Sequence, residues 1–240
     1  MRISTGCDEG PDVVERAEGQ GGELVLRRDG ADFEIISNGM FLMDTRDGES
    51  ERLLVRLAAG GDGPPAAVLI GGLGVGFSLA EAVRLPRVQR VTVVEREPAV
   101  IAWHDTFLRA CSEGALDDPR VTLERADLLD WLRSPPAGTG RYDAICLDID
   151  NGPEWTVTPG NARLYGDAGL DLLARHLAPG GVLAVWSAGA APAFEDLLRR
   201  RFDRVQAREV PARRGEPDVV YLARGTREAA GPTNPETAKL

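Results

Sequence analysis

A glycine-rich turn is the first feature of the chain whose residue types and spacing suggest a ligand site. It follows the apolar run 66–70 and contains Gly71, Gly72, Gly74 and Gly76. Because glycine has no Cβ, the backbone can turn sharply there and a ligand can lie against the main chain. The spacing G-x-G-x-G differs from the G-x-G-x-x-G of dinucleotide sites, which favours a nucleoside that carries no phosphate. The alternative is a turn that needs glycine only for packing.

Two acidic residues follow the next two apolar runs. Glu95 ends the run 90–94, where a carboxylate can accept two hydrogen bonds from a ribose diol. The adjacent Arg96 joins it in the predicted nucleoside site. Asp127, beside apolar Leu128, can accept a hydrogen bond from an adenine amino group. The structural alternatives are a surface glutamate at the end of a strand and an aspartate that only caps a helix.

The segment 148–155, with the sequence DIDNGPEW, concentrates acidic side chains beside an indole. In an open α/β sheet, ligands bind at the carboxyl ends of the strands. The carboxylates and Trp155 can hold a cationic amine or sulfonium by charge and cation–π attraction. Asp148 or Asp150 can also deprotonate an attacking amine. The alternative is an acidic loop in which Trp155 is a lid packed on the core.

Alternating strands and helices are predicted to position these residues. Continuous apolar runs are typical of strands buried on both faces of a parallel sheet, and they lie at 66–70, 90–94, 121–123, 144–147 and 182–186. Helices are predicted at about 77–85, 98–111, 127–133, 163–177 and 191–201, and a terminal strand pair at 204–210 and 219–224. The predicted fold class is therefore α/β, a doubly wound, mostly parallel sheet of seven strands.

A smaller unit is predicted ahead of this sheet. Residues 23–60 read as a small β cap, with an Asn-Gly hairpin turn at 38–39, followed by a helix over about 49–58. Residues 61–225 form the predicted ligand-binding domain. The segments 1–22 and 226–240 are poor in apolar residues and are predicted to be disordered tails.

Composition excludes several classes of function. The 240 residues include 28 Lys and Arg against 38 Asp and Glu, a formal net charge of −10, which disfavours general binding of nucleic acid or an anionic membrane. The three cysteines and two histidines show no metal-ligand spacing and no disulfide framework, so we expect no metal. No apolar leader or membrane-length apolar segment is present in this sequence, and we expect a cytoplasmic protein.

Taken together, the motifs resemble the spermidine synthase-like branch of the class I S-adenosylmethionine-dependent transferases. The resemblance covers about residues 23–190 and is clearest in AAVLIGGLGVG, VTVVEREP, ALDDPRVTLERADLLDWL, YDAICLDIDNGPEW and HLAPGGVLAVW. It implies the Rossmann-like methyltransferase fold and a homodimer formed through the cap. It also implies that Glu95 holds the ribose, Asp127 and Leu128 the adenine, the turn 71–76 the sulfonium side chain, and Asp148 the reacting amine.

Three features depart from the pattern of the synthases. Gly74 and Asn151 stand where the synthases usually carry acidic residues. In an ungapped alignment, Glu51 and Arg52 replace a Tyr-His pair. The segment 187–192 reads Ser-Ala-Gly-Ala-Ala-Pro, in place of an aromatic-rich acceptor segment. The nucleoside half of the site therefore matches the family, whereas the acceptor half differs.

On these grounds we predict a methyltransferase that uses S-adenosylmethionine and acts on a small-molecule acceptor, possibly an amine, with Asp148 or Asp150 aligning or deprotonating the nucleophile. Arg52 is predicted to bind the α-carboxylate of the donor, although it could equally be a solvated helix residue. If the alignment slips by one residue, Glu51 takes this place and favours the decarboxylated, cationic donor. The alternatives are aminopropyl transfer from decarboxylated S-adenosylmethionine to a polyamine, and a non-catalytic nucleoside-binding or scaffold relative.

Overall fold

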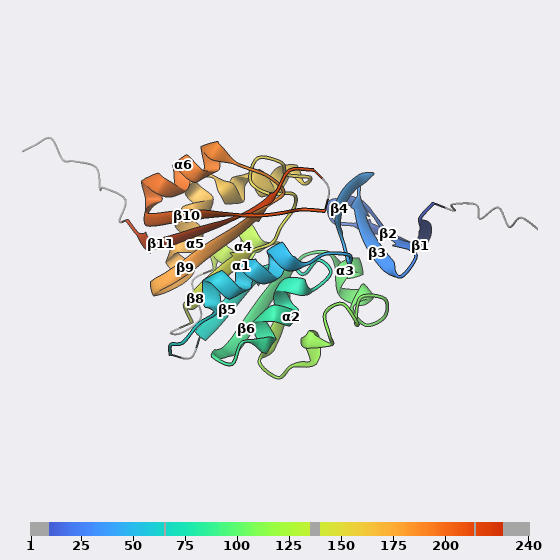
Figure 1. Cartoon of the computed structure of the whole chain (residues 1–240), viewed down its shortest axis with the longest axis horizontal. Helices are drawn as coiled ribbons and strands as arrows, with labels where there is room; N and C mark the ends of the chain where they lie inside the picture. The colour runs from blue at the N-terminus through green and yellow to red at the C-terminus, as the bar shows by residue number, and fades with distance from the viewer. Residues whose placement is uncertain (1–9, 65, 135–139, 214, 228–240) are drawn as a thin grey trace, which may run out of the picture.

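Two β-sheets organise the molecule in the computed structural model, which describes residues 10–64, 66–134, 140–213 and 215–227. A four-stranded antiparallel sheet with the order β1-β2-β3-β4 forms the N-terminal cap. A seven-stranded sheet with the order β10-β11-β9-β8-β5-β6-β7 forms the main body (Figure 1). The predicted α/β class, the seven strands and the β cap are confirmed.

The cap contains one strand that composition did not reveal. Its strands are β1 (Asp12–Gly19), β2 (Gly22–Asp29), β3 (Asp32–Ser37) and β4 (Met40–Asp44). The prediction of a disordered tail over 1–22 is therefore wrong for residues 12–19. Main-chain hydrogen bonds hold β1 against β2, while most β1 side chains stay exposed or half-buried, so the strand needs few apolar residues. Residues 1–9 and 228–240 lie outside the described residues.

The main sheet is parallel apart from one strand. Its strands are β5 (Ala66–Gly71), β6 (Val88–Glu95), β7 (Val121–Arg125), β8 (Tyr142–Leu147), β9 (Leu177–Ser187), β10 (Phe202–Val210) and β11 (Asp218–Thr226). Only β11 runs antiparallel to its neighbours, β9 and β10. The predicted terminal strand pair is thus a hairpin whose second strand inserts beside β9.

Helices cover both faces of this sheet. They are α1 (Glu49–Ala59), α2 (Phe77–Arg84), α3 (Pro98–Trp103), α4 (Leu128–Arg133), α5 (Asp167–His176) and α6 (Pro192–Arg201), with 3₁₀ turns η1 (Ala115–Asp117) and η2 (Pro159–Tyr165). Among the described residues, no helix is long and apolar enough to cross a membrane.

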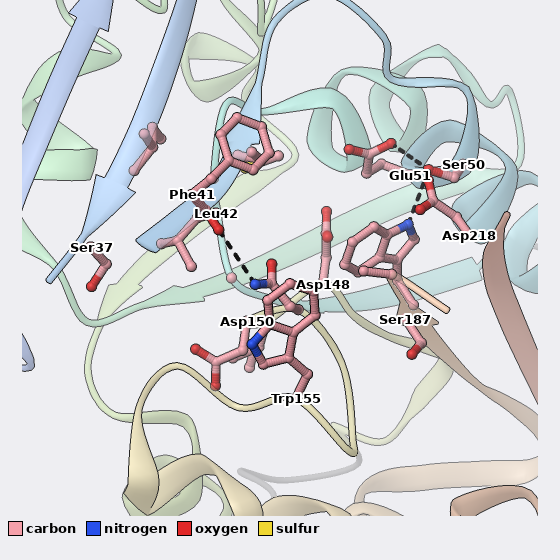
Figure 2. Close-up of a pocket in the computed structure, with 18 of the residues that line it drawn as sticks. Ser37, Phe41, Leu42, Ser50, Glu51, Asp148, Asp150, Trp155, Ser187 and Asp218 are labelled. Carbon is pink, nitrogen blue, oxygen red and sulfur yellow. Dashed lines mark hydrogen bonds between the residues drawn. The ribbon is translucent and has the colours of Figure 1, made fainter. Parts of the chain in front are cut away.

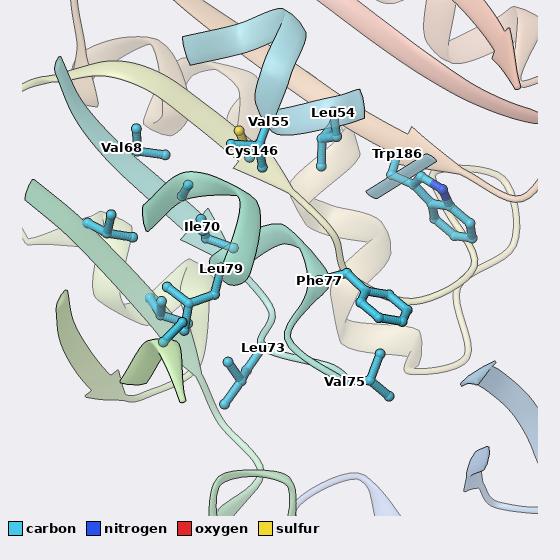
Figure 3. Packing of buried hydrophobic residues seen from close by; sticks show 14 of the residues in the cluster. Leu54, Val55, Val68, Ile70, Leu73, Val75, Phe77, Leu79, Cys146 and Trp186 are labelled. Carbon is cyan, nitrogen blue, oxygen red and sulfur yellow. The ribbon is translucent and has the colours of Figure 1, made fainter. Parts of the chain in front are cut away.

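Two hydrophobic cores explain why the strands read as continuous apolar runs. Val68 and Ile70 of β5 face the core that α1 and α2 cover, which Figure 3 shows from close by. Leu69, between them, faces the core that α4, α5 and α6 cover. Successive side chains of a strand point to opposite faces, and both faces here are buried, so every position of the strand is apolar.

Two predicted helices are shorter than their apolar patterns indicated. The helix predicted over 98–111 ends at Trp103 and continues as irregular turns, in which the amide of Leu108 donates to the carbonyl of Trp103. His104 lies in this segment, and its Nε2 is 2.9 Å from the carbonyl oxygen of Gly74, so packing against the glycine turn replaces helical continuation. The helix predicted over 163–177 is divided where Gly166 adopts an extended conformation between η2 and α5.

The strand order places a crevice at the centre of the sheet. Strand β5 pairs with β6 on one side and β8 on the other, which is the point where the chain reverses its direction across the sheet. At this point the amide of Asp148 donates to the carbonyl of Gly71, over 2.9 Å, and the amide of Gly72 donates to Val94, over 3.0 Å. The glycine turn and the acidic segment therefore begin side by side.

Gly72→Ala is expected to destabilise the protein. Gly72 has φ +89°, and a Cβ there would overlap the carbonyl oxygen of Asp148. A left-handed backbone costs a non-glycine residue about 1–3 kcal/mol, and the clash with main chain adds to that. Gly30→Ala is the matched control, because Gly30 has φ +63° and a methyl group on its Cα would meet nothing within 4 Å. Chemical denaturation should give a larger loss of unfolding free energy for Gly72→Ala; equal losses would contradict the packing argument.

Candidate active site

A cavity of about 1170 Å³ opens at the carboxyl ends of the central strands. Its walls come from the end of β5, the segments that follow β6, β7, β8 and β9, the start of α1, and the loop before β11. Strands β3 and β4 of the cap cover it. Figure 2 shows the end of the cavity where the cap, α1 and the loop after β8 meet.

The predicted glycines divide into two groups. Gly72 and Gly74 line the cavity, and at Gly74 the Sδ atom of Met43 from β4 fills the space that a side chain would take. Gly71 and Gly76 do not line it. A Cβ on Gly76 would crowd His104 and Ser112, and one on Gly71 would crowd Leu128. Packing thus leaves no room for a side chain at any of the four glycines, and only Gly72 and Gly74 also present their backbone to the cavity.

Glu95 is a buried carboxylate that organises the turn. Its Oε2 accepts from the amide of Leu73 over 2.9 Å, and its Oε1 accepts from the amide of Glu97 over 2.8 Å. Burial raises the pKa of Glu95, and these amide bonds oppose the rise. Each oxygen keeps a further lone pair, and the side chain lines the cavity, so it can still accept from a ligand hydroxyl.

Asp127 caps a helix, as the structural alternative predicted, and it also lines the cavity. Its Oδ1 accepts from the amide of Asp130 over 3.1 Å and caps α4. Its Oδ2 lies 3.9 Å from the guanidinium of Arg96, which pairs with Glu97 over 2.9 Å. Leu128 and Arg96 line the cavity beside it. The structure therefore brings the predicted nucleoside residues together.

Asp148 occupies the inner wall of the cavity. Its Oδ2 accepts a hydrogen bond from the hydroxyl of Ser78 on α2 over 2.8 Å. Burial raises the pKa of Asp148 to about 6, and the bond from Ser78 opposes the rise. A half-buried carboxylate that lines a cavity and has its pKa raised to about 6 suits a proton acceptor.

Asp150 lies at the rim on strained backbone. It has φ +54°, and its Oδ2 accepts from Nδ2 of Asn161 over 2.6 Å. Burial raises its pKa, opposed by the bond from Asn161. Trp155 is 54% exposed and lines the cavity, so it is not the core-packed lid of the structural alternative. Phe41 of β4, 48% exposed, also lines the cavity, and its carbonyl oxygen accepts from Nδ2 of Asn151 over 3.3 Å (Figure 2).

Arg52 does not reach the cavity. Its guanidinium lies 4.3 Å from the ring centroid of Phe77, and it is not among the lining residues. The prediction that Arg52 binds the donor carboxylate is therefore not supported. Glu51 lines the cavity instead, 7% exposed and facing the same end as Asp148. The structure therefore has the arrangement expected if the alignment slips by one residue, with Glu51 and not Arg52 at the cavity.

Asp218 was missed by the sequence analysis. It begins β11 and lines the same end of the cavity as Glu51 and Asp148, where burial raises its pKa. It belongs to no motif, and 70 residues separate it from Asp148. Only the insertion of β11 beside β9 brings it there, so no local signal could have identified it.

Negative charge dominates the cavity wall. Its described lining residues include fourteen Asp or Glu and three Arg. Arg46 is paired with acidic residues of the cap, and Arg96 with Glu97. Among the residues that the structure describes, no group of His, Cys, Asp or Glu has an arrangement suited to a metal ion. The wall is therefore suited to a cationic organic ligand.

The comparisons agree with this chemistry. The family model described as "Spermine/spermidine synthase domain" matches residues 49–195. A polyamine aminopropyltransferase of Mycobacterium tuberculosis is 36% identical over 166 residues, which are 68% of this chain and 30% of that protein. Polyamine aminopropyltransferase 1 of Streptomyces coelicolor is 39% identical over 127 residues, 52% of this chain and 23% of its own length.

Solved structures show the same fold. Spermidine synthase from Thermotoga maritima matches with a TM-score of 0.71 at 17% identity, over 89% of this chain and 72% of that one. A spermidine synthase in complex with the transition-state analogue AdoDATO matches with a TM-score of 0.70 at 17% identity, over the same 89% and 72%.

The fold and the cavity define an α/β protein with an acidic cavity at the carboxyl ends of its central strands. The chain belongs to the spermine/spermidine synthase domain family, because the family model covers more than half of its residues. It spans about 30% of the length of the first curated relatives. Our prediction of a methyltransferase is contradicted, since the family is named for spermine and spermidine synthases and these relatives are named polyamine aminopropyltransferases. They favour the alternative of aminopropyl transfer.

Proposed function

We propose that this chain carries an aminopropyl-transfer site that uses decarboxylated S-adenosylmethionine as donor and an aliphatic amine as acceptor. The observation that supports it most is the end of the cavity, where Glu51, Asp148 and Asp218 converge and none of the three arginines of the described lining forms an ion pair with them. The family membership and the aminopropyltransferase relatives support the same reaction.

The negative charge of this wall discriminates between the two possible donors. S-adenosylmethionine carries an α-carboxylate that its decarboxylated form lacks. Two like charges about 4 Å apart repel by about 4 kcal/mol at an effective dielectric constant of 20. The acidic wall therefore disfavours the carboxylated donor and attracts the ammonium group of the decarboxylated one.

In the proposed mechanism, the nucleoside lies against Gly72 and Gly74, with Glu95 accepting from its ribose and Asp127 and Leu128 contacting its adenine. The acidic end then receives the aminopropyl group and the acceptor amine. The acceptor must be neutral to attack, so an ammonium group first transfers one proton to the carboxylate of Asp148. A C–N bond then forms at the aminopropyl methylene carbon attached to sulfur, while the bond from that carbon to sulfur breaks and its electron pair stays on sulfur, which leaves methylthioadenosine.

This mechanism assigns catalysis to positioning and proton transfer. The two substrates are held in one cavity, which turns a bimolecular encounter into an oriented reaction. Asp148 supplies general-base catalysis, and Asp150, Trp155 and Phe41 form the wall through which the acceptor enters. The homodimer expected from family resemblance stays a prediction.

Competition binding of the two donors tests the proposal. Wild-type protein is expected to bind decarboxylated S-adenosylmethionine at least about tenfold more tightly than the carboxylated form, equivalent to about 1.4 kcal/mol. Arg52→Ala should keep that preference, because Arg52 stacks on Phe77 outside the cavity. Calorimetric titration measures both affinities. Tighter binding of the carboxylated donor by wild type, or a preference that changes in Arg52→Ala, would contradict the donor assignment.

A further inference from the structure

Ser50 is the hub of a hydrogen-bond cluster at the acidic end of the cavity. Its Oγ lies 3.0 Å from Nε1 of Trp186, 2.8 Å from Oε2 of Glu51 and 2.7 Å from Oδ2 of Asp218 (Figure 2). Three elements meet here, because Ser50 and Glu51 start α1, Trp186 belongs to β9 and Asp218 begins β11. Ser50 and Glu51 are buried, 5% and 7% exposed.

The hydrogen atoms available to this cluster fix its protonation. The indole N–H of Trp186 can only donate, so the hydroxyl of Ser50 accepts there. That hydroxyl has a single proton and can donate to only one of the two carboxyl groups. The other carboxyl group must donate to Ser50 Oγ, because both oxygen–oxygen distances are those of hydrogen bonds. One of Glu51 and Asp218 therefore carries a proton in this arrangement.

Among the described residues, no Lys or Arg forms an ion pair with Glu51 or Asp218. The charges that act on Glu51 are those of Asp148 after β8 and Asp218 of β11, and Asp47 before α1 acts on Asp218. Helix α1 and the elements packed against it also carry Arg52 and Arg56 of α1, Glu81 of α2 and Cys146 of β8. Arg52 stacks on Phe77, and Arg56 pairs with Glu49 and lies 3.6 Å from Glu81.

The pKa values of Glu51 and Asp148 agree with the protonation inferred from the hydrogen-bond geometry. Burial, reinforced by the charge of Asp148, raises the pKa of Glu51 to about 8. The pKa of Asp148 rises less, to about 6, because the hydroxyl of Ser78 stabilises its ionised form. At neutral pH, Asp148 is thus the group that has lost its proton and Glu51 the group that retains it.

We propose that Ser50 and Asp218 are positioning residues that keep one proton on the Glu51–Asp218 pair at neutral pH, so that Asp148 is the ionised carboxylate that faces the reacting amine. This inference rests on the proposed function for its catalytic meaning, but not for its geometry. With the proton held on the pair, Asp148 is free to accept the N–H proton of the acceptor.

Infrared difference spectroscopy of the protein without substrate tests the shared proton. The C=O band of a protonated carboxyl group should be present at pH 7 and disappear as the pH rises through about 8. In Glu51→Gln, Ser50 can donate to Asp218 alone, and the band at pH 7 should be lost. In Asp218→Asn, Ser50 can donate to Glu51 alone, and the band should disappear at a lower pH than in wild type.

Glu49→Gln is the matched control, since Glu49 lies on the same helix but pairs with Arg56 at the surface. It should keep the wild-type band. Absence of the band at pH 7 in wild type, or an unchanged titration in Asp218→Asn, would overturn the inference. If Asp218→Asn fails to fold, the comparison of wild type with Glu51→Gln decides, because Gln is nearly isosteric with a protonated Glu.

The pH dependence of stability gives a second readout. A carboxyl group whose pKa is raised on folding binds its proton more strongly in the native state, so its contribution is present below the unfolded pKa and is lost as the pH rises through the folded value. The unfolding free energy of wild type should therefore fall between about pH 4.5 and pH 8 more steeply than that of Glu51→Gln. Equal slopes would contradict the shared proton.

These readouts separate the inference from the proposed function. A shared proton in a protein that transfers no aminopropyl group would support the cluster and contradict the function. Aminopropyl transfer by a protein without the band would support the function and overturn the cluster.

Discussion

Replacement of Asp148 by asparagine is expected to lower kcat for aminopropyl transfer by about two to four orders of magnitude, the range that general-base catalysis contributes. Asparagine keeps an oxygen that can accept from Ser78, as the Asp148 carboxylate does over 2.8 Å, so the wall should retain its shape. What it loses is the ability to take a proton from the amine. Steady-state kinetics with decarboxylated S-adenosylmethionine and a linear diamine measures the effect.

Two further variants make the Asp148 experiment specific. Asp150→Asn should reduce kcat less, because Asp150 lies at the rim and is bonded to Asn161, and asparagine tolerates its positive φ. Asp105→Asn, at an exposed position outside the cavity, should leave kcat unchanged. Normal turnover by Asp148→Asn would mean that Asp148 is only a structural residue.

Glu95→Ala is expected to weaken nucleoside binding about ten- to a hundredfold, or about 1.5–3 kcal/mol. The change removes a candidate acceptor for the ribose hydroxyls. It also leaves the amides of Leu73 and Glu97 without the carboxylate that they now share, so the glycine turn loses its link to the segment after β6. Calorimetric titration with methylthioadenosine measures the affinity without any charge from the donor tail.

The Glu95 experiment has a matched control in the neighbouring strand. Glu124→Ala changes a half-buried glutamate of β7 that does not line the cavity, and its affinity should match wild type. The unfolding transition of Glu95→Ala must show that it is folded at the titration temperature. An unchanged dissociation constant in the folded variant would contradict the ribose assignment.

The buried parallel sheet could be predicted from sequence because its signal is local. The runs 66–70, 90–94 and 144–147 are followed directly by Gly71, Glu95 and Asp148, and Asp127 lies four residues after the run 121–123, so the sheet brings these residues to one edge. Glu95, Asp127 and Asp148 were found in this way. Strand β1 was not predicted, because its stability comes from main-chain pairing with β2 and not from apolar side chains.

The residues at the acidic end of the cavity could not all be predicted, because sequence patterns do not determine the helix register or the strand order that brings them there. Successive residues of an α-helix point about 100° apart, so a shift of one position in the alignment exchanges Glu51, inside the cavity, for Arg52, which stacks on Phe77. Asp218 reaches the same place only through the topology of the last hairpin. Gly74 and Asn151 carry no carboxyl group, so the sequence alone favours methyl transfer, whereas Glu51 and Asp218 supply carboxyl groups from other elements.

The central claim is tested most directly by incubating the protein with decarboxylated S-adenosylmethionine and linear aliphatic diamines and analysing the mixture by mass spectrometry. We expect methylthioadenosine together with a diamine that has gained one aminopropyl group, and a strong reduction of both with Asp148→Asn. In a parallel reaction, S-adenosylmethionine should give neither S-adenosylhomocysteine nor a methylated amine. Formation of these two products from S-adenosylmethionine, or no product from the decarboxylated donor with any diamine, would contradict aminopropyl transfer.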